Sequence, residues 1–192
     1  MKIYFVLLLV VLTLGRDYPL FNQCDAKWAN ERLGSSNITI CKGGDLISAV
    51  AMGLSGIGVN QNPSTLNKWL AANKGYDTKH QYVWASVNPL GVSYSGQVGN
   101  SILRINLDVG YLVIINVEKG AHWVLATGYS GNTIFVRDSL HTTIQSYDMT
   151  QIVSGHNAVY KVPNSLPEHV LNKYDDVLNI SHQKEKKNLE AE

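Results

Sequence analysis

Residues 111–136 read YLVIINVEKGAHWVLATGYSGNTIFV, and this stretch decides the fold class. It holds three apolar runs, which the turn-forming residues Lys119-Gly120 and Ser130-Gly131-Asn132 separate. Apolar runs of this length between turn signals predict buried strands, and the last two runs predict a hairpin. The predicted strands cover residues 111–117, 122–129 and 133–136.

The sequence before these strands has the pattern of helices. Residues 45–54 are mostly apolar or small, and we expect Asp45 to cap the helix that they form. Asn62-Pro63-Ser64 predicts the start of a second helix, which ends near Gly75. A short strand is expected at 82–84 and an edge strand at 158–162. Helices that come first and strands that follow them indicate an α+β fold with an antiparallel sheet.

Length and composition exclude several classes of protein. The chain has 192 residues, a formal net charge of +1 and two cysteines. This length suits one domain with or without a tail, and the near-neutral charge argues against a nucleic-acid partner. Two cysteines are too few for a zinc ribbon or a cysteine-dense scaffold. The sequence has no phosphate-binding loop, dinucleotide fingerprint or zinc-peptidase motif, so we expect no cofactor and no metal.

The two ends differ in composition from the middle of the chain. Lys2 precedes an apolar run over residues 3–12, and small residues follow before the polar stretch that begins at Arg16. This pattern predicts a secretory signal peptide at 1–15, with an uncleaved signal anchor or a buried strand as the alternative. We therefore expect a domain over 16–162 and a charged tail over 163–192, which contains at most one short helix.

Secretion would place the mature protein in an oxidising compartment, which allows Cys24 and Cys41 to pair. Asn37 and Asn179 begin sequons for N-glycosylation, which occurs on the same route. We expect a monomeric glycoprotein in the secretory lumen or outside the cell, with no membrane association once the signal peptide is removed.

Two polar residues stand at the ends of neighbouring predicted strands. His122 opens one strand and Asp138 follows the next, so a hairpin brings the two residues to the same end. A carboxylate beside a histidine orients the imidazole and stabilises its cation, as in nucleophile–His–acid triads, although many such pairs are only structural. The remaining candidates are expected to be exposed loop histidines (His80, His141, His156) and core aromatics rather than a carbohydrate platform (Trp28, Trp69, Trp84, Trp123).

Several short motifs follow one another along residues 18–147. They are Asn22-Gln23-Cys24-Asp25-x-x-Trp28-Ala29, Leu33-Gly34, Thr39-Ile40-Cys41-x-x-Gly44-Asp45, Val50-Ala51-Met52, Asn62-Pro63-x-x-Leu66-Asn67-x-Trp69-Leu70, Gly75-Tyr76, Gly120-Ala121-His122-Trp123-Val124-Leu125-Ala126-Thr127-Gly128-Tyr129 and Val136-Arg137-Asp138-Ser139. In this order they resemble the papain-like cysteine peptidases of the bacteriocin-processing type (cysteine peptidase family 39), in a secreted stand-alone form. The resemblance implies a papain-like fold.

The resemblance also implies roles for four positions. Gln23 falls on the glutamine that donates to the oxyanion, His122 on the general base and Asp138 on the residue that orients this base. The family's nucleophilic cysteine belongs directly after Gly44, where this sequence has Asp45. A carboxylate cannot replace a thiolate in this chemistry. We therefore predict a pseudopeptidase that has lost its nucleophile and binds a peptide or protein ligand in the family's cleft.

Two alternatives remain at this stage. Cys41 lies four residues before Asp45 and could act as a relocated nucleophile with His122 and Asp138, or Asp45 could act in another chemistry. Secreted members of the family often have cysteines at both the Cys24 and Cys41 positions, and the resemblance therefore implies a disulfide between them. The second alternative is a metal site formed by Asp45, His122 and Asp138.

Overall fold

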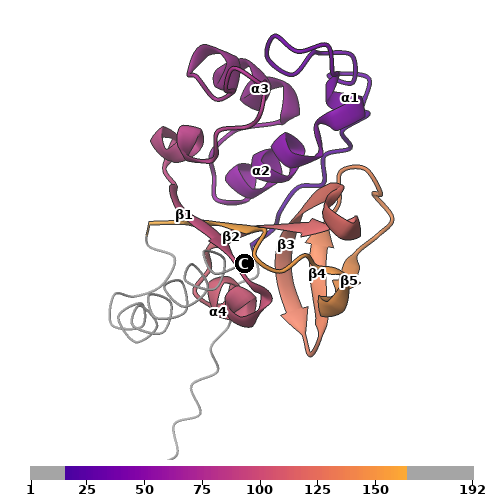
Figure 1. The fold of residues 1–192 in the computed structure, drawn as a ribbon, viewed down its shortest axis with the longest axis vertical. Coiled ribbons are helices and arrows are strands. Elements are labelled where there is room, and N and C mark those ends of the chain that lie inside the picture. Colours follow the sequence, from indigo (N-terminus) through magenta and orange to yellow (C-terminus); the bar gives the residue numbers. More distant parts are fainter. Residues whose placement is uncertain (1–15, 164–192) are drawn as a thin grey trace, which may run out of the picture.

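The structure is a computed structural model, and it describes residues 16–163. A layer of helices lies on one side of an antiparallel sheet, and a shorter helix lies on the other side (Figure 1). The predicted signal peptide, the predicted tail helix and the second sequon at Asn179 lie outside the described residues. Within 16–163, no helix is long and apolar enough to cross a membrane.

The helical layer consists of α1 (Ile40–Gly43), α2 (Asp45–Gly56) and α3 (Pro63–Ala72). Helix α2 is buried over 47–54, so it forms the centre of the layer. Helix α3 begins with a capping box, in which Asn62 and Thr65 each accept a hydrogen bond from the other's backbone amide. Both predicted helices are therefore confirmed, although α2 extends two residues further than predicted.

The sheet has six strands in the order β1-β6-β2-β3-β4-β5, and every neighbouring pair is antiparallel. The strands are β1 (Ser93–Val98), β2 (Leu112–Val117), β3 (His122–Ser130), β4 (Thr133–Arg137), β5 (Ser146–Asp148) and β6 (Asn157–Lys161). Strands β2, β3 and β4 confirm the three strands predicted within residues 111–136. The pairs Val117↔His122 and Ser130↔Thr133 close the two successive hairpins.

Two strand predictions are wrong. The predicted edge strand is β6, and it lies inside the sheet because Ala158 pairs with Gln97 of β1 and with Ile114 of β2. The predicted strand at 82–84 is only a bridge between Tyr76 and Tyr82, and the 3-10 helix η1 (Trp84–Leu90) follows it. The edge strands are β1 and β5, which are mostly polar and give little apolar signal in the sequence.

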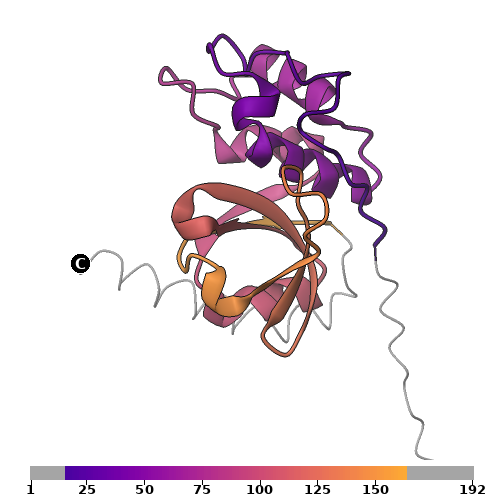
Figure 2. The same ribbon diagram turned by 90° about the vertical axis from the view of Figure 1, so that its right-hand side faces the viewer.

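Apolar side chains cover both faces of the sheet. One core lies between the helical layer and the sheet, and Leu125 of β3 belongs to it. The second core lies on the opposite face, where Val124 and Ala126 of β3 pack with α4 (Leu103–Asp108). Figure 2 shows the curved sheet edge-on below the helical layer. Because α2 lies directly against β3, the start of that helix and the start of that strand come together.

The described part contains three further 3-10 segments. The 3-10 segments are η2 (Asn100–Ile102), η3 (Glu118–Gly120) and η4 (Met149–Gln151).

The positions of the four tryptophans agree with the prediction that they are core aromatics. Trp28 is buried, and the other three are half-buried and pack against the core between the helical layer and the sheet. Asn37, which begins the first sequon, is exposed.

Candidate functional site

Asp45 lies at the junction of the helical layer and the sheet. It is the first residue of α2, and the N-cap is Gly44, so the prediction that Asp45 caps this helix is wrong. Its Oδ2 instead accepts the backbone amide of Trp123 at 2.8 Å and lies 3.0 Å from His122 Nδ1. The carboxylate therefore joins α2 to the first two residues of β3. It does not cap the helix, because its hydrogen bonds go to β3.

His122 lies between two carboxylates. Its Nδ1 faces Asp45, and its Nε2 lies 2.8 Å from Asp138 Oδ1. The His122 side chain is 2% exposed and the Asp45 side chain is 16% exposed, so Asp45 forms the outer end of this group. The structure thus brings together the three residues that the sequence placed at the nucleophile, base and orienting positions.

Asp138 is held rigidly from several sides. It is fully buried in the turn after β4, and its Oδ1 also accepts the backbone amides of Leu140 and His141. Its Oδ2 accepts the hydroxyl of Tyr147, which comes from β5. A buried carboxylate is stable only when it is paired and hydrogen-bonded, and Asp138 meets both conditions.

The two carboxylates determine the charge of His122. Burial by itself would lower the pKa of His122, but the hydrogen bonds and charges of Asp138 and Asp45 outweigh burial and raise it from 6.5 to about 9. Burial likewise would raise the pKa of Asp138, yet His122, the His141 amide and Tyr147 together lower it from 3.8 to about 2. Burial and the Asp138 charge raise the pKa of Tyr147. His122 is therefore a cation at neutral pH and donates from both ring nitrogens.

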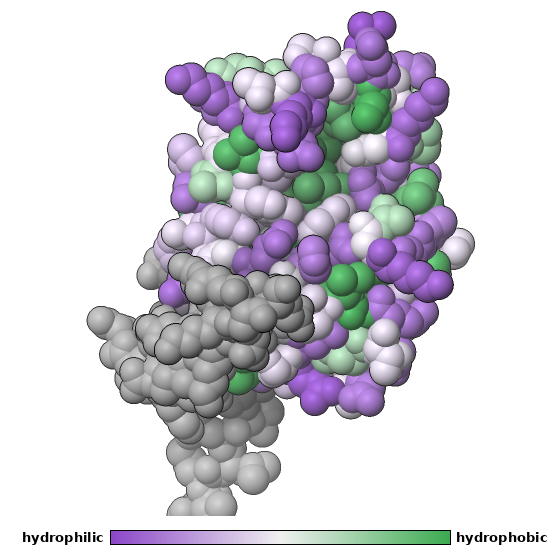
Figure 3. Space-filling model, viewed as in Figure 1, coloured by the Kyte–Doolittle hydropathy of each residue, from purple (hydrophilic) through white to green (hydrophobic). Residues whose placement is uncertain are grey.

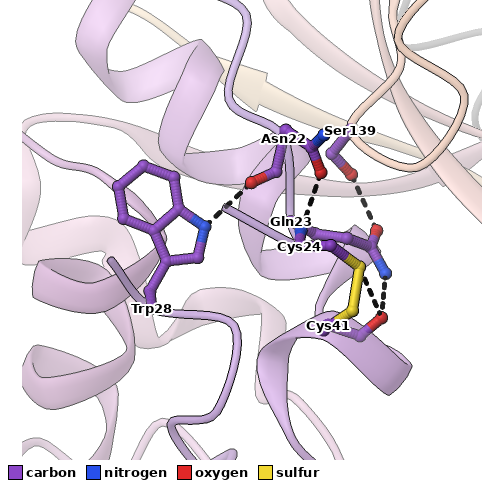
Figure 4. Close-up of a disulfide and its surroundings, with 6 residues drawn as sticks. All are labelled: Asn22, Gln23, Cys24, Trp28, Cys41 and Ser139. Carbon is purple, nitrogen blue, oxygen red and sulfur yellow. Dashed lines mark hydrogen bonds between the residues drawn. A yellow bond between two sulfur atoms is a disulfide. The ribbon is translucent and has the colours of Figure 1, made fainter. Parts of the chain in front are cut away.

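Gln23 lies beside this group and connects three segments, as Figure 4 shows. Its Nε2 donates to the carbonyl of Cys41 at 2.9 Å, and its Oε1 accepts the hydroxyl of Ser139 at 3.0 Å. Its backbone amide donates to the carbonyl of Ser139. The residue predicted to donate to an oxyanion thus holds the N-terminal segment between α1 and the turn that carries Asp138.

Cys24 and Cys41 form a disulfide, with 4.3 Å between their Cα atoms (Figure 4). Both cysteines of the chain lie in the described part, and neither thiol is free there. A disulfide-bonded sulfur cannot act as a thiolate nucleophile. The structure therefore agrees with the disulfide that the family resemblance implies, and it offers no thiol for the relocated-nucleophile alternative.

The metal alternative meets a geometric obstacle. Each ring nitrogen of His122 faces a different carboxylate, so Asp45 and Asp138 lie on opposite sides of the ring and do not converge. Across residues 16–163, no group of three or more His, Cys, Asp or Glu side chains is placed to hold a metal ion.

The other histidines fall outside the triad. His80 and His156 are exposed, as predicted, whereas His141 is only partly so, with 40% of its side chain exposed. The His141 ring lies 5.5 Å from the His122 ring, and its Nε2 lies 3.2 Å from Glu118 Oε1. The sequence predictions did not include this neighbour of His122, although the position of His141 three residues after Asp138 in the same turn was a usable signal.

A shallow pocket of about 420 Å³ opens elsewhere, on the helical layer. It is lined by residues of α3 and of the loops beside it: Gly34, Ser35, Leu70, Ala71, Lys74, Tyr76, Asp77, Thr78 and His80. None of the triad residues lines it, so this pocket and the Asp45 site are separate places on the molecule.

No protein-family model and no curated protein matches this chain. Two solved structures are similar in fold. One, assigned as a C39-like peptidase from Bacillus anthracis, has a TM-score of 0.53 and 12% identity and covers 79% of this chain and 97% of its own. The other is a double glycine motif protease from an AMS/PCAT transporter in complex with the leader peptide, with a TM-score of 0.50, 15% identity and coverage of 78% and 96%.

These likenesses define the class of fold. The chain has the α+β papain-like fold of C39-like peptidases, with helices packed on an antiparallel six-stranded sheet. At identities this low the comparison concerns the fold alone, and the function of this chain has to be argued from its own site.

Proposed function

We propose that this chain is a secreted pseudopeptidase, which keeps the fold of a C39-like peptidase, lacks cysteine peptidase chemistry and binds a peptide. The observation that carries the proposal is the carboxylate of Asp45 at the start of α2, 3.0 Å from His122 Nδ1. A papain-like enzyme needs a thiolate beside its imidazolium at this point. Here a carboxylate forms the ion pair with the imidazolium instead.

The chemistry of a carboxylate supports the absence of peptide hydrolysis. Attack on an amide carbonyl by Asp45 would form a mixed anhydride and expel an amine, and a carboxylate is too weak a nucleophile for this step. A protonated His122 is compatible with papain-type chemistry, in which an imidazolium pairs with a thiolate, so the missing thiolate is the decisive difference. The group that the peptidase reaction lacks here is therefore the nucleophile.

Two observations support a peptide ligand and a secretory route. One structure of this fold is a complex with a leader peptide, so a protein of this fold can hold a peptide. The disulfide between Cys24 and Cys41 is typical of proteins that mature in an oxidising compartment, which agrees with the predicted signal peptide and the exposed sequon at Asn37.

The proposal is tested with the mature secreted protein and a broad peptide library, analysed by mass spectrometry for cleavage and by retention on the immobilised protein for binding. We expect retained peptides and no cleavage products beyond those that His122→Ala also gives. Cleavage that disappears in His122→Ala would overturn the proposal, and so would a library from which no peptide is retained.

A second arm tests the identity of the Asp45 position. Asp45→Cys places a thiol beside His122, and we expect it to react with iodoacetamide at least about tenfold faster than the thiol of Asp77→Cys, because an adjacent imidazolium lowers a thiol pKa. Asp77 is exposed and lies away from the triad, which makes it the matched control. Equal rates for the two thiols would show that Asp45 does not occupy a nucleophile position.

A further inference from the structure

The ligand class of the proposed peptide-binding site can be taken one step further, and this step rests on the proposed function. We propose that the ligand is a basic peptide, and that Asp45 and the neighbouring aromatic rings bind the side chain of one of its lysine or arginine residues. The aromatic residues in question, called here the aromatic wall, are Tyr82, Trp84, Tyr94 and Trp123.

Asp45 has one oxygen left for a ligand. Its Oδ2 is occupied by the Trp123 amide and by His122 Nδ1. Its Oδ1 makes no hydrogen bond to any residue of 16–163, and the side chain remains 16% exposed. A partly exposed carboxylate oxygen without a partner is a site for an N–H donor, and a cationic donor forms the strongest such bond.

The charge of the group favours a cation. Asp45, His122 and Asp138 together hold two carboxylates and one imidazolium, which leaves a net charge of −1. Asp138 is fully buried, so the excess negative charge reaches the surface through Asp45. Across residues 16–163, no lysine or arginine forms an ion pair with either carboxylate. A positively charged ligand group would neutralise this net charge of −1.

The aromatic wall begins at the residue whose amide binds Asp45. The Trp123 and Trp84 rings meet edge to face with 5.2 Å between their centroids, and Trp84 stacks on Tyr94 at 5.8 Å. Tyr82 contacts Trp84 from another side at 5.3 Å. All four residues are half-buried, so each remains partly accessible to the solvent. On the face drawn in Figure 3, pale residues of intermediate hydropathy gather on the left at mid-height, and hydrophilic residues lie beside them at the centre and on the right.

Both the stem and the cation of a lysine or arginine side chain fit the aromatic wall and the Asp45 carboxylate. Its aliphatic stem packs on aromatic rings, and its cation is attracted both by the ring faces and by the carboxylate. Neither indole N–H of Trp84 and Trp123 has a hydrogen-bond partner within the described residues, so both can donate to the carbonyl groups of a bound peptide. An uncharged peptide would use the rings and leave Asp45 Oδ1 unpaired.

The test uses three acetylated and amidated pentapeptides of sequence Ala-Ala-Xaa-Ala-Ala, in which Xaa is lysine, norleucine or glutamate. Their dissociation constants are measured by NMR titration of the mature protein at about 0.02 M and about 0.5 M salt. We expect the lysine peptide to bind at least about tenfold more tightly than the norleucine peptide at low salt, and this ratio to shrink at high salt. Norleucine matches the length of the lysine stem, so the ratio reports the charge.

Variants locate the effect. Asp45→Asn keeps the size of the side chain and is expected to abolish the preference for lysine, while Trp84→Leu is expected to weaken both peptides several-fold. Asp77→Asn removes an exposed carboxylate on the helical layer, and Phe135→Leu removes an exposed ring of β4; both should leave the ratio unchanged. Near-ultraviolet circular dichroism checks that each variant is folded, and the Trp84→Leu and salt measurements remain decisive if Asp45→Asn does not fold.

The outcomes separate this inference from the proposed function. Equal binding of all three peptides would overturn the inference and leave a peptide-binding protein. A preference for lysine that survives in Asp45→Asn would overturn the assignment to Asp45. A protein that binds neither these pentapeptides nor any member of the broad library would overturn the proposed function and the inference together.

Discussion

His122 has a carboxylate on each side of its ring, and this arrangement favours the protonated form of the ring. A neutral imidazole carries a single N–H, so it can donate to only one of two acceptors. Donation to both Asp45 and Asp138 needs the doubly protonated ring, which has no lone pair to accept another proton. The residue that resembles a general base is therefore the positive centre of an ion triplet.

A measurable pH dependence follows from this charge. Because the pKa of His122 is raised from 6.5 to about 9, its stabilising effect is complete below pH 6.5 and is lost as the pH rises through about 9. We predict that the free energy of unfolding falls by roughly 2 kcal/mol between these two pH values. Urea unfolding at each pH measures it. His122→Asn is the control, and an equal fall in that variant would show that other groups cause the change.

Tyr147 is expected to contribute through Asp138. Its hydroxyl donates to Asp138 Oδ2 at 2.8 Å, and this bond helps to lower the pKa of the carboxyl. Tyr147→Phe should cost about 1.5–3 kcal/mol at pH 7, because it removes a buried hydrogen bond to a charged group. Acid unfolding should also begin at a higher pH, since stability from a lowered carboxyl pKa is lost as the pH falls.

Tyr129→Phe is the matched control for Tyr147→Phe. The Tyr129 hydroxyl also donates to a carboxylate, that of Asp108, but this pair is exposed. Exposed pairs contribute little, so we expect a cost of under about 1 kcal/mol. Urea unfolding of both variants gives the comparison, and similar costs would mean that burial of Asp138 does not strengthen its bond to Tyr147.

At the scale of elements, the cap of α3 is expected to stabilise the helical layer measurably. Asn62 Oδ1 accepts the amide of Thr65, and Thr65 Oγ1 accepts the amide of Asn62. Asn62→Ala should lower the free energy of unfolding by about 1 kcal/mol, whereas Asn62→Asp keeps an acceptor and should cost much less. Chemical denaturation of the two variants checks the prediction, which is refuted if both lose the same amount.

The success of sequence reasoning differed from element to element for physical reasons. Strands β2 and β3 and helix α2 are rich in apolar residues, so their patterns predicted them directly. Strand β1 reads SYSGQV and has an irregular register between Tyr94 and Gly96, so nothing in the sequence marked it as the neighbour that places β6 inside the sheet. The partners of Asp45 come from β3, far along the chain, and the capping rule alone chose the wrong partner.

The site itself was predictable in part. The predicted hairpin, with its turn at residues 130–132, placed His122 and Asp138 at one end of the sheet. The family resemblance added Gln23 and Asp45. What the sequence could not give was the hydrogen bonding of Gln23, because the bonds of its side-chain amide to Cys41 and Ser139 depend on how three distant segments meet. The aromatic wall likewise depends on η1 lying beside β1 and β3, which local patterns do not encode.

At the scale of the whole molecule, the N-terminal segment connects the two layers. Gln23 hydrogen-bonds to Ser139 in the turn between β4 and β5, and the next residue, Cys24, is joined by the disulfide to Cys41 of α1. The turn that carries Asp138 is therefore tied to the helical layer that carries Asp45. This connection fixes both carboxylates relative to His122, which is a condition for the raised pKa of the ring.

We predict that loss of the disulfide lowers the free energy of unfolding by about 3 kcal/mol, the usual effect of closing a loop of this length. The loop spans a sequence separation of 17 residues. Unfolding of the double variant Cys24→Ala/Cys41→Ala and of the reduced wild type measures the effect, and the two should agree. Stability unchanged by reduction would contradict the prediction.

Reduction also tests the relocated-nucleophile alternative at its strongest point, because it frees the thiol of Cys41. We expect the reduced protein to cleave no library peptide that the oxidised protein leaves intact, since Asp45 still occupies the place beside His122 Nδ1 that a nucleophile would need. Intact mass after alkylation reports how many thiols are free before and after reduction. Cleavage that appears on reduction and disappears in both Cys41→Ala and His122→Ala would instead make this a redox-controlled peptidase.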